Sequence, residues 1–272
     1  MNRIKKMFEI TSNEKRSAFG TFLTAGDPNI ETSEKLLEIL AENDVDFIEI
    51  GMPFSDPMAD GPAIQASSLR SIKNGISLEK TFKIVKNFRK KFANIPVILM
   101  GYYNPIYIYG NKKFLEKCEK NGVDGLIIVD LPPEEDQELY DLTKNLEIDF
   151  IRLITPTTKG NRLKLILRKA SGFVYYVSVA GITGTKVAKN SSIRKSLGEI
   201  RKFTKLPIVT GFGIRSPDQA KEIGKMSDAI VIGSKIIGFI ETSINSKKMD
   251  TNKMFNEISK FCKRISFSLK NG

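Results

Sequence analysis

Short, uniformly apolar runs alternate along this chain with longer stretches in which apolar residues recur every three or four positions. The runs are rich in β-branched and aromatic residues and too short for helices, which predicts strands buried on both faces. Eight strands are predicted, at residues 18–24, 46–51, 96–101, 125–130, 148–154, 173–178, 207–211 and 229–233. Strands of this kind, each followed by a helical stretch, indicate a parallel sheet built through helical crossovers.

The stretches between the strands have the period of amphipathic helices; in the first of them Leu36, Leu37, Ile39 and Leu40 form an apolar stripe. Seven crossover helices are predicted, at residues 31–43, 78–92, 111–121, 134–145, 160–169, 191–204 and 216–225. Three further helical segments are expected, at residues 2–13 before the first strand, 62–74 inside the second crossover and 250–269 at the end.

Eight such units in 272 residues fit a closed barrel better than an open, doubly wound sheet, because the barrel typically takes about 250 residues. The predicted fold class is therefore α/β, a (β/α)8 TIM barrel with extra N-terminal and loop helices. No linker, low-complexity tract or change of composition divides the chain. We expect residues 1–272 to form a single barrel domain.

The length of the apolar runs indicates whether the chain can cross a membrane. No apolar run approaches the roughly 18–20 residues that a membrane-spanning helix needs. The basic N-terminus, residues 1–6, is followed neither by a long apolar stretch nor by a small-residue cleavage site, as a signal peptide would be. The expectation is a soluble, cytoplasmic protein without membrane contact.

The charge balance is strongly basic, with 43 Lys and Arg against 31 Asp and Glu and a net charge of +12. Such an excess raises the alternative of a nucleic-acid-binding protein. The basic residues, however, are scattered along predicted helices, as at Lys83, Lys86 and Lys90, and no nucleic-acid-binding motif accompanies them. We expect a solvated lysine-rich surface and no nucleic-acid partner, with at most a modest preference for an anionic substrate.

Histidine is absent, and the only cysteines, Cys118 and Cys262, are remote from each other in sequence. This excludes a Ser-His-Asp triad, a Cys-His pair and a histidine-ligated zinc, and no metal site is expected. None of the predicted strands contains a lysine, so a Schiff-base lysine on a strand is also excluded. Proton transfer near neutral pH must then use carboxylates, Lys, Tyr, Cys or water, with carboxylate pKa values adjusted by burial.

Glu49 is the candidate acid–base residue on a strand. Active sites of such barrels lie at the carboxyl ends of the strands and in the loops that follow them. Period-two alternation puts Phe47 and Glu49 on one face and Ile48 and Ile50 on the other. The isoleucines suit the helix-covered outside, so Glu49 is expected to point into the barrel mouth. A structural Glu held by backbone donors is the alternative.

The loop after this strand, residues 51–62, contains three prolines and two glycines as well as Asp56 and Asp60. Prolines and glycines give a loop a defined shape, and a shaped loop can present a carboxylate to a site. Aspartates are also common in turns for local hydrogen-bonding reasons. On this evidence alone, a functional and a structural role remain open for both aspartates.

Three glycine-bearing loops follow the last three predicted strands, at residues 181–184, 211–213 and 233–234. Glycines let backbone amides approach an anion closely, and a short helix beginning at Ser234 would direct its N-terminus to the same place. Barrels often bind phosphate with the loops after strands seven and eight. The sequence therefore predicts a phosphate site there.

Residues 47–65, Phe-Ile-Glu-Ile-Gly-Met-Pro-Phe-Ser-Asp-Pro-Met-Ala-Asp-Gly-Pro-Ala-Ile-Gln, closely resemble the sequence motif of tryptophan synthase alpha subunits. Shorter matches lie at 102–105 (Tyr-Tyr-Asn-Pro), 130–132 (Asp-Leu-Pro), 155–158 (Thr-Pro-Thr-Thr), 175–184 and 211–214. The resemblance is looser at residues 179–180 and at Arg215. It extends from about the first strand to the end of the chain.

The resemblance implies a lyase of tryptophan biosynthesis that cleaves indole-3-glycerol phosphate, by a retro-aldol reaction, to indole and glyceraldehyde 3-phosphate. It implies that Glu49 and Asp60 are the catalytic pair: Glu49 would protonate the indole ring carbon and help remove the glycerol hydroxyl proton, while Asp60 would stabilise or accept the proton of the indole nitrogen. The substrate-binding residues that it implies are Phe22, Met100, Tyr102, Val129, Leu153, Tyr175, Thr183, Gly184, Gly211, Phe212, Gly213, Ile232, Gly233 and Ser234.

A partner is implied in the same way. The resemblance implies a beta subunit, in an alpha2-beta2 assembly, that receives indole through a tunnel and docks on the mouth of this barrel. The rim residues implied for that contact are Pro53, Asp56, Pro57 and Asn104. Pyridoxal phosphate is expected in the partner only, and no cofactor in this chain.

Other functions remain as alternatives. An isomerase acting on a phosphorylated sugar would normally need a different acid–base set at the strand ends, and an indole-glycerol-phosphate synthase would need a catalytic lysine on a strand. A non-enzymatic subunit kept only to activate a partner is a further alternative, against which the intact Glu49 and Asp60 argue.

Overall fold

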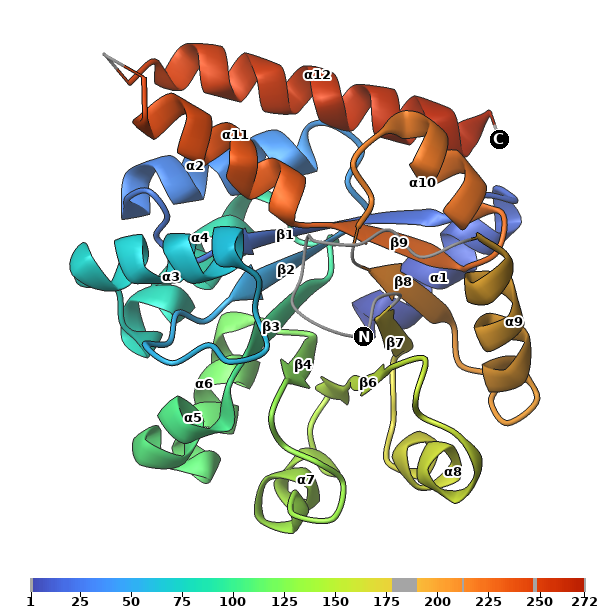
Figure 1. The fold of residues 1–272 in the computed structure, drawn as a ribbon. Coiled ribbons are helices and arrows are strands. Elements are labelled where there is room, and N and C mark those ends of the chain that lie inside the picture. Colours follow the sequence, from blue (N-terminus) through green and yellow to red (C-terminus); the bar gives the residue numbers. More distant parts are fainter. Residues whose placement is uncertain (1, 178–189, 212, 247–248, 272) are drawn as a thin grey trace.

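Nine strand segments, all parallel to their neighbours, surround a common interior in the computed structural model (Figure 1). The structure describes residues 2–177, 190–211, 213–246 and 249–271. The strands are β1 (Ala18–Thr24), β2 (Phe47–Gly51), β3 (Val97–Gly101), β4 (Gly125–Ile128), β5 (Asp149–Phe150), β6 (Arg152–Ile154), β7 (Val174–Val177), β8 (Ile208–Gly211) and β9 (Ala229–Ile232). Each predicted strand is found, within one or two residues of its expected ends.

The barrel closes through residues 149–154, which form the fifth strand in two parts. β5 pairs with β4, whereas β6 pairs with β7. Ile151 separates the two parts, and its N–H still bonds to the carbonyl of Leu126 in β4 at 2.9 Å. At the other side β1 pairs with both β2 and β9. The circuit therefore has eight strand positions, and the predicted (β/α)8 barrel is confirmed.

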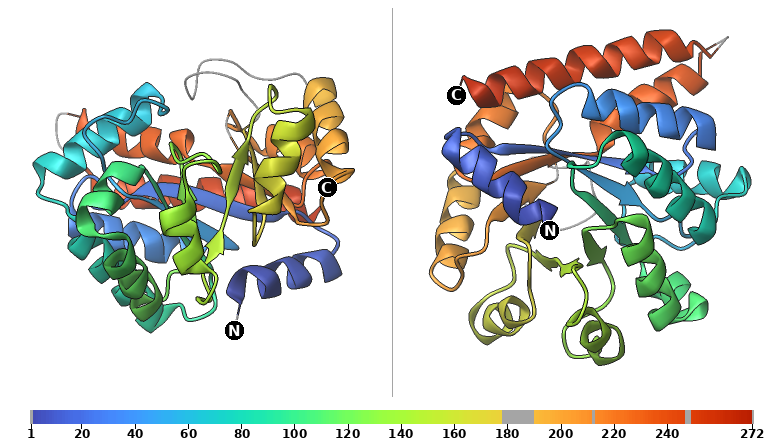
Figure 2. Two further views of the ribbon diagram at one scale, coloured as in Figure 1. Left: turned by 90° about the horizontal axis from the view of Figure 1, so that it is seen from below. Right: turned by 180° about the vertical axis from the view of Figure 1, so that it is seen from behind.

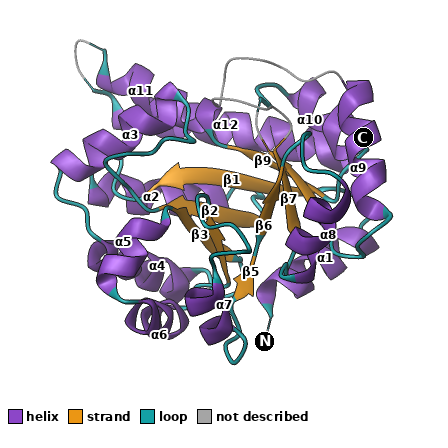
Figure 3. Cartoon of the chain, turned by 60° about the horizontal axis from the view of Figure 1, so that its bottom comes forward, coloured by secondary structure: helices purple, strands orange, loops and turns teal. Residues whose placement is uncertain are grey.

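Helices cover the outside of this barrel (Figures 1 and 3). They are α1 (Arg3–Asn13), α2 (Ile30–Ala41), α3 (Pro62–Lys73), α4 (Leu78–Lys91), α5 (Tyr103–Tyr109), α6 (Asn111–Asn121), α7 (Gln137–Thr143), α8 (Gly160–Arg168), α9 (Asn190–Arg201), α10 (Pro217–Gly224), α11 (Ser234–Ile244) and α12 (Thr251–Lys270). The predicted N-terminal and loop helices are present as α1 and α3. α5 was not predicted.

α7 is shorter than its predicted range of 134–145. The residues before it are held in a loop by two cations, the buried Arg152 and the half-buried Lys169. Arg152 donates to the carbonyl of Leu131, and Lys169 donates to the carbonyl of Pro133 at 2.7 Å. Both cations also pair with Asp136, which is fully buried. The helix starts only after this anchored aspartate.

Alternate residues of each strand fill the interior of the barrel. Where β1 and β2 meet there, a glycine of β1 leaves room for a large side chain of β2. Gly20 pairs with Phe47 in the parallel register. A Cβ built on Gly20 would lie 2.2 Å from the Phe47 ring. A glycine is therefore required where the large ring crosses the barrel, since packed interiors have no spare volume for another methyl group.

α1 closes the end of the barrel where the strands begin, which is called the bottom below (Figure 2). The ring of Phe8 packs edge-on against Phe173, with centroids 6.0 Å apart. Ile4, which is fully buried, lies against Gly125 at the start of β4. The bottom is thus sealed by apolar contacts, and the opposite end, the mouth, is where a ligand can enter.

Three aspartates repeat one arrangement at the bottom. Asp46, Asp124 and Asp228 each directly precede a strand and accept a backbone N–H from the start of the neighbouring strand, at 2.7 Å in all three cases. Each also pairs with arginine: Asp46 with Arg16, Asp124 with Arg3 and Arg89, and Asp228 with Arg201. We call these three residues the bottom aspartates.

No helix within the described ranges is long and apolar enough to cross a membrane.

Candidate active site

Glu49 lies in the middle of β2 on the face that points into the barrel, the same face as Phe47, as the alternation predicted. Its side chain is fully buried, and neither carboxyl oxygen accepts a well-formed hydrogen bond from the residues that the structure describes. Burial raises the pKa of Glu49 well above its usual value, and the neighbouring Tyr175 hydroxyl opposes the rise. Within the described ranges no backbone donor satisfies this carboxyl, as the alternative of a structural Glu would require.

Asp60 reaches the mouth from the end of the loop that follows β2. The Tyr102 hydroxyl donates to the Asp60 carboxylate at 3.1 Å and itself accepts the N–H of Ala59 at 3.0 Å. Burial raises the pKa of Asp60 to about 6, and the bond from Tyr102 opposes the rise. A carboxyl with this pKa can exchange a proton near neutral pH.

The two carboxyls line one cavity, with about 570 Å³ of space unoccupied by protein atoms. The residues that line it are Phe22, Glu49, Asp60, Ile64, Met100, Tyr175, Gly213, Ile214, Arg215, Val231, Gly233 and Ser234.

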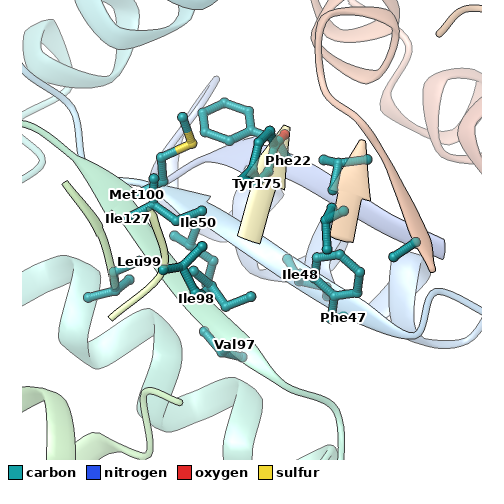
Figure 4. Packing of buried hydrophobic residues seen from close by; sticks show 14 of the residues in the cluster. Phe22, Phe47, Ile48, Ile50, Val97, Ile98, Leu99, Met100, Ile127 and Tyr175 are labelled. Carbon is teal, nitrogen blue, oxygen red and sulfur yellow. The ribbon is translucent and has the colours of Figure 1, made fainter. Parts of the chain in front are cut away.

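One wall of the cavity is apolar and aromatic. Phe22, Met100 and Tyr175 come from three different strands, and Figure 4 shows their side chains gathered near the strand ends, beyond Phe47. Tyr175 also lies against Gly211, where a Cβ would fall 2.1 Å from the Tyr175 hydroxyl oxygen. Gly211 therefore shapes this wall by leaving room for the tyrosine, and it does not itself line the cavity. A flat apolar ligand suits such a wall.

Another part of the cavity is formed by backbone, beside Phe22. Gly213, Gly233 and Ser234 line it, and α11 begins at Ser234 as predicted. The first N–H groups of a helix have no acceptor within the helix and carry a partial positive charge, so they favour an anionic group. Three of the positions predicted for phosphate are thus at the same cavity as Glu49 and Asp60.

Three other predicted substrate residues lie in hollows that adjoin this cavity. Tyr102 and Val129 line a hollow that shares Phe22, Asp60 and Met100 with it. Leu153 and Val129 line a wider hollow that shares Asp60 and Met100. These hollows extend the cavity at the mouth. They are lined by Tyr102, Val129 and Leu153, which do not line the cavity that holds both carboxyls.

The prediction for Ile232 is corrected by the structure. Ile232 is buried, yet it lines none of these hollows, whereas its neighbour Val231 lines the cavity together with Gly233. Side chains of a strand alternate between its two faces, so Ile232 points toward the surrounding helices. The residue of β9 that meets a ligand is Val231.

Ile64 and Arg215 line the cavity without having been predicted as substrate residues. Ile64 belongs to α3, and Arg215 is an exposed cation in the loop after β8. The directions of their side chains depend on how a helix and a loop fold over the mouth. The periodicity of the strands cannot predict this folding. Thr183, Gly184 and Phe212 lie outside the residues that the structure describes.

The residues predicted to contact a partner have different exposures. Asp56 and Asn104 are exposed, Pro53 is half-buried and Pro57 is buried. Asp56 accepts a hydrogen bond from the Ser55 hydroxyl at 2.5 Å, and Asn104 lies on α5. Of the four, Asp56 and Asn104 offer side chains to a partner, while Pro57 lies beneath the rim beside Tyr102.

Neither cysteine belongs to the cavity. Cys118 and Cys262 are buried in α6 and α12, and burial raises the pKa of both thiols. Within the described ranges, no group of three or more His, Cys, Asp or Glu side chains is placed to hold a metal ion.

Comparison with known proteins connects this geometry to a family. The family described as Tryptophan synthase alpha chain matches residues 8–266. The tryptophan synthase alpha chain of Zymomonas mobilis is 48% identical over 260 residues, which are 96% of this chain and 94% of that protein. Among solved structures, tryptophan synthase subunit alpha from Legionella pneumophila is similar over 100% of both chains, with 33% identity and a TM-score of 0.91. A chain of Mycobacterium tuberculosis tryptophan synthase is 26% identical, with a TM-score of 0.89, over 100% of this chain and 99% of that chain.

Proposed function

The chain belongs to the tryptophan synthase alpha chain family, and on that premise we propose that it cleaves indole-3-glycerol phosphate, with Glu49 and Asp60 as the catalytic pair. The family makes it a lyase of tryptophan biosynthesis. One observation carries the specific reaction: two carboxyls with raised pKa values face one cavity that is lined both by an apolar, aromatic wall and by a helix N-terminus.

The placement of the substrate follows from these two parts of the lining. The indole ring packs against Phe22, Met100 and Tyr175, and the phosphate lies at Gly233 and Ser234. In this pose the glycerol carbons cross the centre of the cavity, between the two carboxyls. The phosphate contributes binding energy away from the reacting bond, which holds that bond in place.

Glu49 supplies the proton that starts the cleavage. Because burial raises its pKa, the carboxyl is protonated near neutral pH and can give its proton to the indole ring carbon that carries the glycerol chain. The resulting carboxylate removes the proton from the adjacent glycerol hydroxyl. The carbon–carbon bond then breaks, its electron pair returns to the ring, and glyceraldehyde 3-phosphate is released with Glu49 protonated again.

Asp60 serves the ring nitrogen. Protonation of the ring carbon makes the N–H acidic and positively charged, and a carboxylate beside it stabilises that charge or accepts the proton. A pKa of about 6 leaves Asp60 mostly ionised at neutral pH while keeping it a competent base. The ring thus stores the electrons of the broken bond, and the reaction needs neither a lysine nor a metal in this chain.

The proposal is tested by incubating the purified chain with indole-3-glycerol phosphate and measuring indole and glyceraldehyde 3-phosphate. Equal amounts of the two products are expected, with no requirement for added pyridoxal phosphate or metal. If the chain releases no indole, alone or with a beta subunit, this reaction is wrong for it.

A beta subunit that holds the pyridoxal phosphate is the proposed partner, in an alpha2-beta2 assembly docked on the rim at Asp56 and Asn104. Both side chains are exposed at the mouth, where indole would leave. Asp56→Ala should lower activation by the beta subunit and leave the melting temperature of the isolated chain unchanged. Equal activation of the variant and the wild type would exclude Asp56 from the interface. We also propose that residues 1–272 form a single domain.

A further inference from the structure

α3 is bound along one face to the loop between β1 and α2. Four of its polar residues, spaced three or four apart and therefore on one side of the helix, make these contacts: they are Ser67, Arg70, Ser71 and Asn74. The hydroxyls of Ser67 and Thr24 are 2.5 Å apart. Ser71 donates to the carbonyl of Ala25, and Asn74 donates to the carbonyl of Pro28.

The strongest of these contacts is the ion pair between Arg70 and Asp27. Two nitrogens of the Arg70 guanidinium donate to the two carboxylate oxygens of Asp27, at 2.9 and 2.8 Å. Asp27 is fully buried, and the Arg70 side chain is 23% exposed. Paired bonds of this kind fix direction as well as distance, which a lysine cannot reproduce.

The same helix holds the loop that carries Asp60. The Ser68 hydroxyl accepts the N–H of Phe54 at 2.9 Å and donates to the carbonyl of Phe54 at 3.0 Å. The Gln65 amide donates to the carbonyl of Asp60 at 2.9 Å. Ile64, in the first turn of the helix, lines the cavity beside Asp60. A shift of α3 would therefore move Asp60 with it.

We propose that Arg70 is a positioning residue for Asp60: its ion pair with Asp27 holds α3 against the loop after β1, and α3 sets where Asp60 enters the cavity. Neither Arg70 nor Asp27 lines the cavity, so the action is indirect. This inference rests on the proposed function, because it assigns Asp60 a role in the cleavage of indole-3-glycerol phosphate.

The main variant is Arg70→Lys, which keeps the charge and removes the two-point contact. A displacement of about 1 Å at a reacting group can cost about 10²-fold in rate. We expect kcat for indole release to fall by about 10- to 100-fold, while KM, set largely by the phosphate and the apolar wall, changes much less.

The chain provides a matched control. Arg16 also donates through two nitrogens to the two carboxylate oxygens of one aspartate, Asp46, at 2.6 and 2.8 Å, but at the bottom of the barrel. Arg16→Lys should lower the melting temperature and leave kcat as in the wild type. If Arg70→Lys and Arg16→Lys lower stability equally and neither changes kcat, Arg70 is a structural residue only.

A double-mutant cycle identifies Asp60 as the group through which Arg70 acts. In the Asp60→Asn background Arg70→Lys should have little further effect on kcat, since coupled positions are not additive. Independent, multiplied effects would overturn the proposal. If Arg70→Lys does not fold, Ser71→Ala takes its place in the cycle, because it removes the bond to Ala25 without touching a charge.

A readout without catalysis separates this inference from the proposed function. Titration of the Asp60 carboxyl by ¹³C NMR should give a pKa of about 6 in the wild type. In Arg70→Lys the value should fall toward that of a hydrated aspartate, because a displaced Asp60 gains water. The other ionisable groups that face the same region, Glu49, Tyr102, Tyr175 and Arg215, are unchanged in this comparison. An unaltered Asp60 titration in a folded variant contradicts the proposal, whether or not the wild type releases indole.

Discussion

The buried carboxylates at the bottom of this barrel and the two that face the cavity at its mouth have opposite environments. At the bottom, Asp46 and Asp124 are paired with arginines and also accept a backbone N–H. At the mouth, Glu49 and Asp60 form no ion pair with the described residues; each has only a tyrosine hydroxyl beside its carboxyl.

The difference shows what each end is built for. A paired carboxylate in a protein interior is held in its charged form, whereas an unpaired one is destabilised by burial and gains a raised pKa. The bottom therefore fixes charges in place and stabilises the fold. The mouth keeps carboxyls ready to give and take protons, at a cost to stability that is typical of functional sites.

Of the variants at the mouth, Glu49→Gln is expected to lose the most catalytic activity. The amide keeps the shape and removes the titrating proton, so turnover should fall by more than the roughly 10²–10⁴-fold that loss of one general acid–base group usually costs. The loss should exceed that range because one group performs both transfers. Indole release by the isolated chain measures it, and near-normal turnover would refute the assignment of Glu49. The melting temperature at pH 8 should rise, because the variant no longer buries a carboxyl.

Asp60→Asn should also be severe, within about 10²–10⁴-fold in kcat. The variant can still accept the bond from Tyr102 but can no longer act as a base. Asp56→Asn is the matched control, since Asp56 lies in the same loop and is exposed. It should keep most of the intrinsic cleavage. The distinction between the two aspartates fails if both variants lose activity equally.

At the bottom, Asp124→Asn should affect stability rather than catalysis. Asp124 is 6% exposed and pairs with both Arg3 and Arg89. The pKa of Arg89 is lowered to about 10, chiefly by burial. Removing one member of a buried ion pair usually costs about 3–5 kcal/mol. Chemical denaturation measures this loss. At a temperature where the variant is folded, kcat should equal that of the wild type, and a lower kcat would contradict the division between the two ends.

The smallest expected effect is a dependence of stability on pH that arises at the mouth. The pKa of Asp60 is about 6 in the folded protein, against 3.8 for an unperturbed aspartate, and that of Glu49 is raised above 4.5. The folded state thus binds more protons than the unfolded state, so stability falls as pH rises from about 4 through 6. The double variant Glu49→Gln/Asp60→Asn should show a shallower decline in melting temperature over this range. Parallel curves for the two proteins would contradict the raised pKa values.

The barrel could be predicted from sequence because each of its strands is a short apolar run. Residue alternation also placed Glu49 correctly, since Phe47 and the two isoleucines fix the orientation of β2. The error at Ile232 has the same basis: a shift of one residue along a strand transfers a side chain to the opposite face. Val231 was the residue to choose on β9.

What could not be predicted depends on contacts between distant segments. The sequence of α5, Tyr-Asn-Pro-Ile-Tyr-Ile-Tyr, is rich in residues that disfavour helices, and its first N–H is held by Asp130, from the loop after β4, at 2.8 Å. The orientation of Ile64 likewise follows from the contacts of α3 with the loop after β1. The residues in these contacts are far apart in the chain, so local periodicity cannot predict that they meet.

The position of α1 has a consequence for how the protein is made. This helix leaves the ribosome before any strand of the barrel, yet it docks on Gly125 and Phe173, which are synthesised more than a hundred residues later. β1 must also wait for β9, its neighbour from the far end of the chain. The nascent chain therefore holds its first helix and one edge of its first strand without partners for most of translation. Because such long-range closures are slow, the stage most exposed to chaperones and proteases is the one before the final strand emerges.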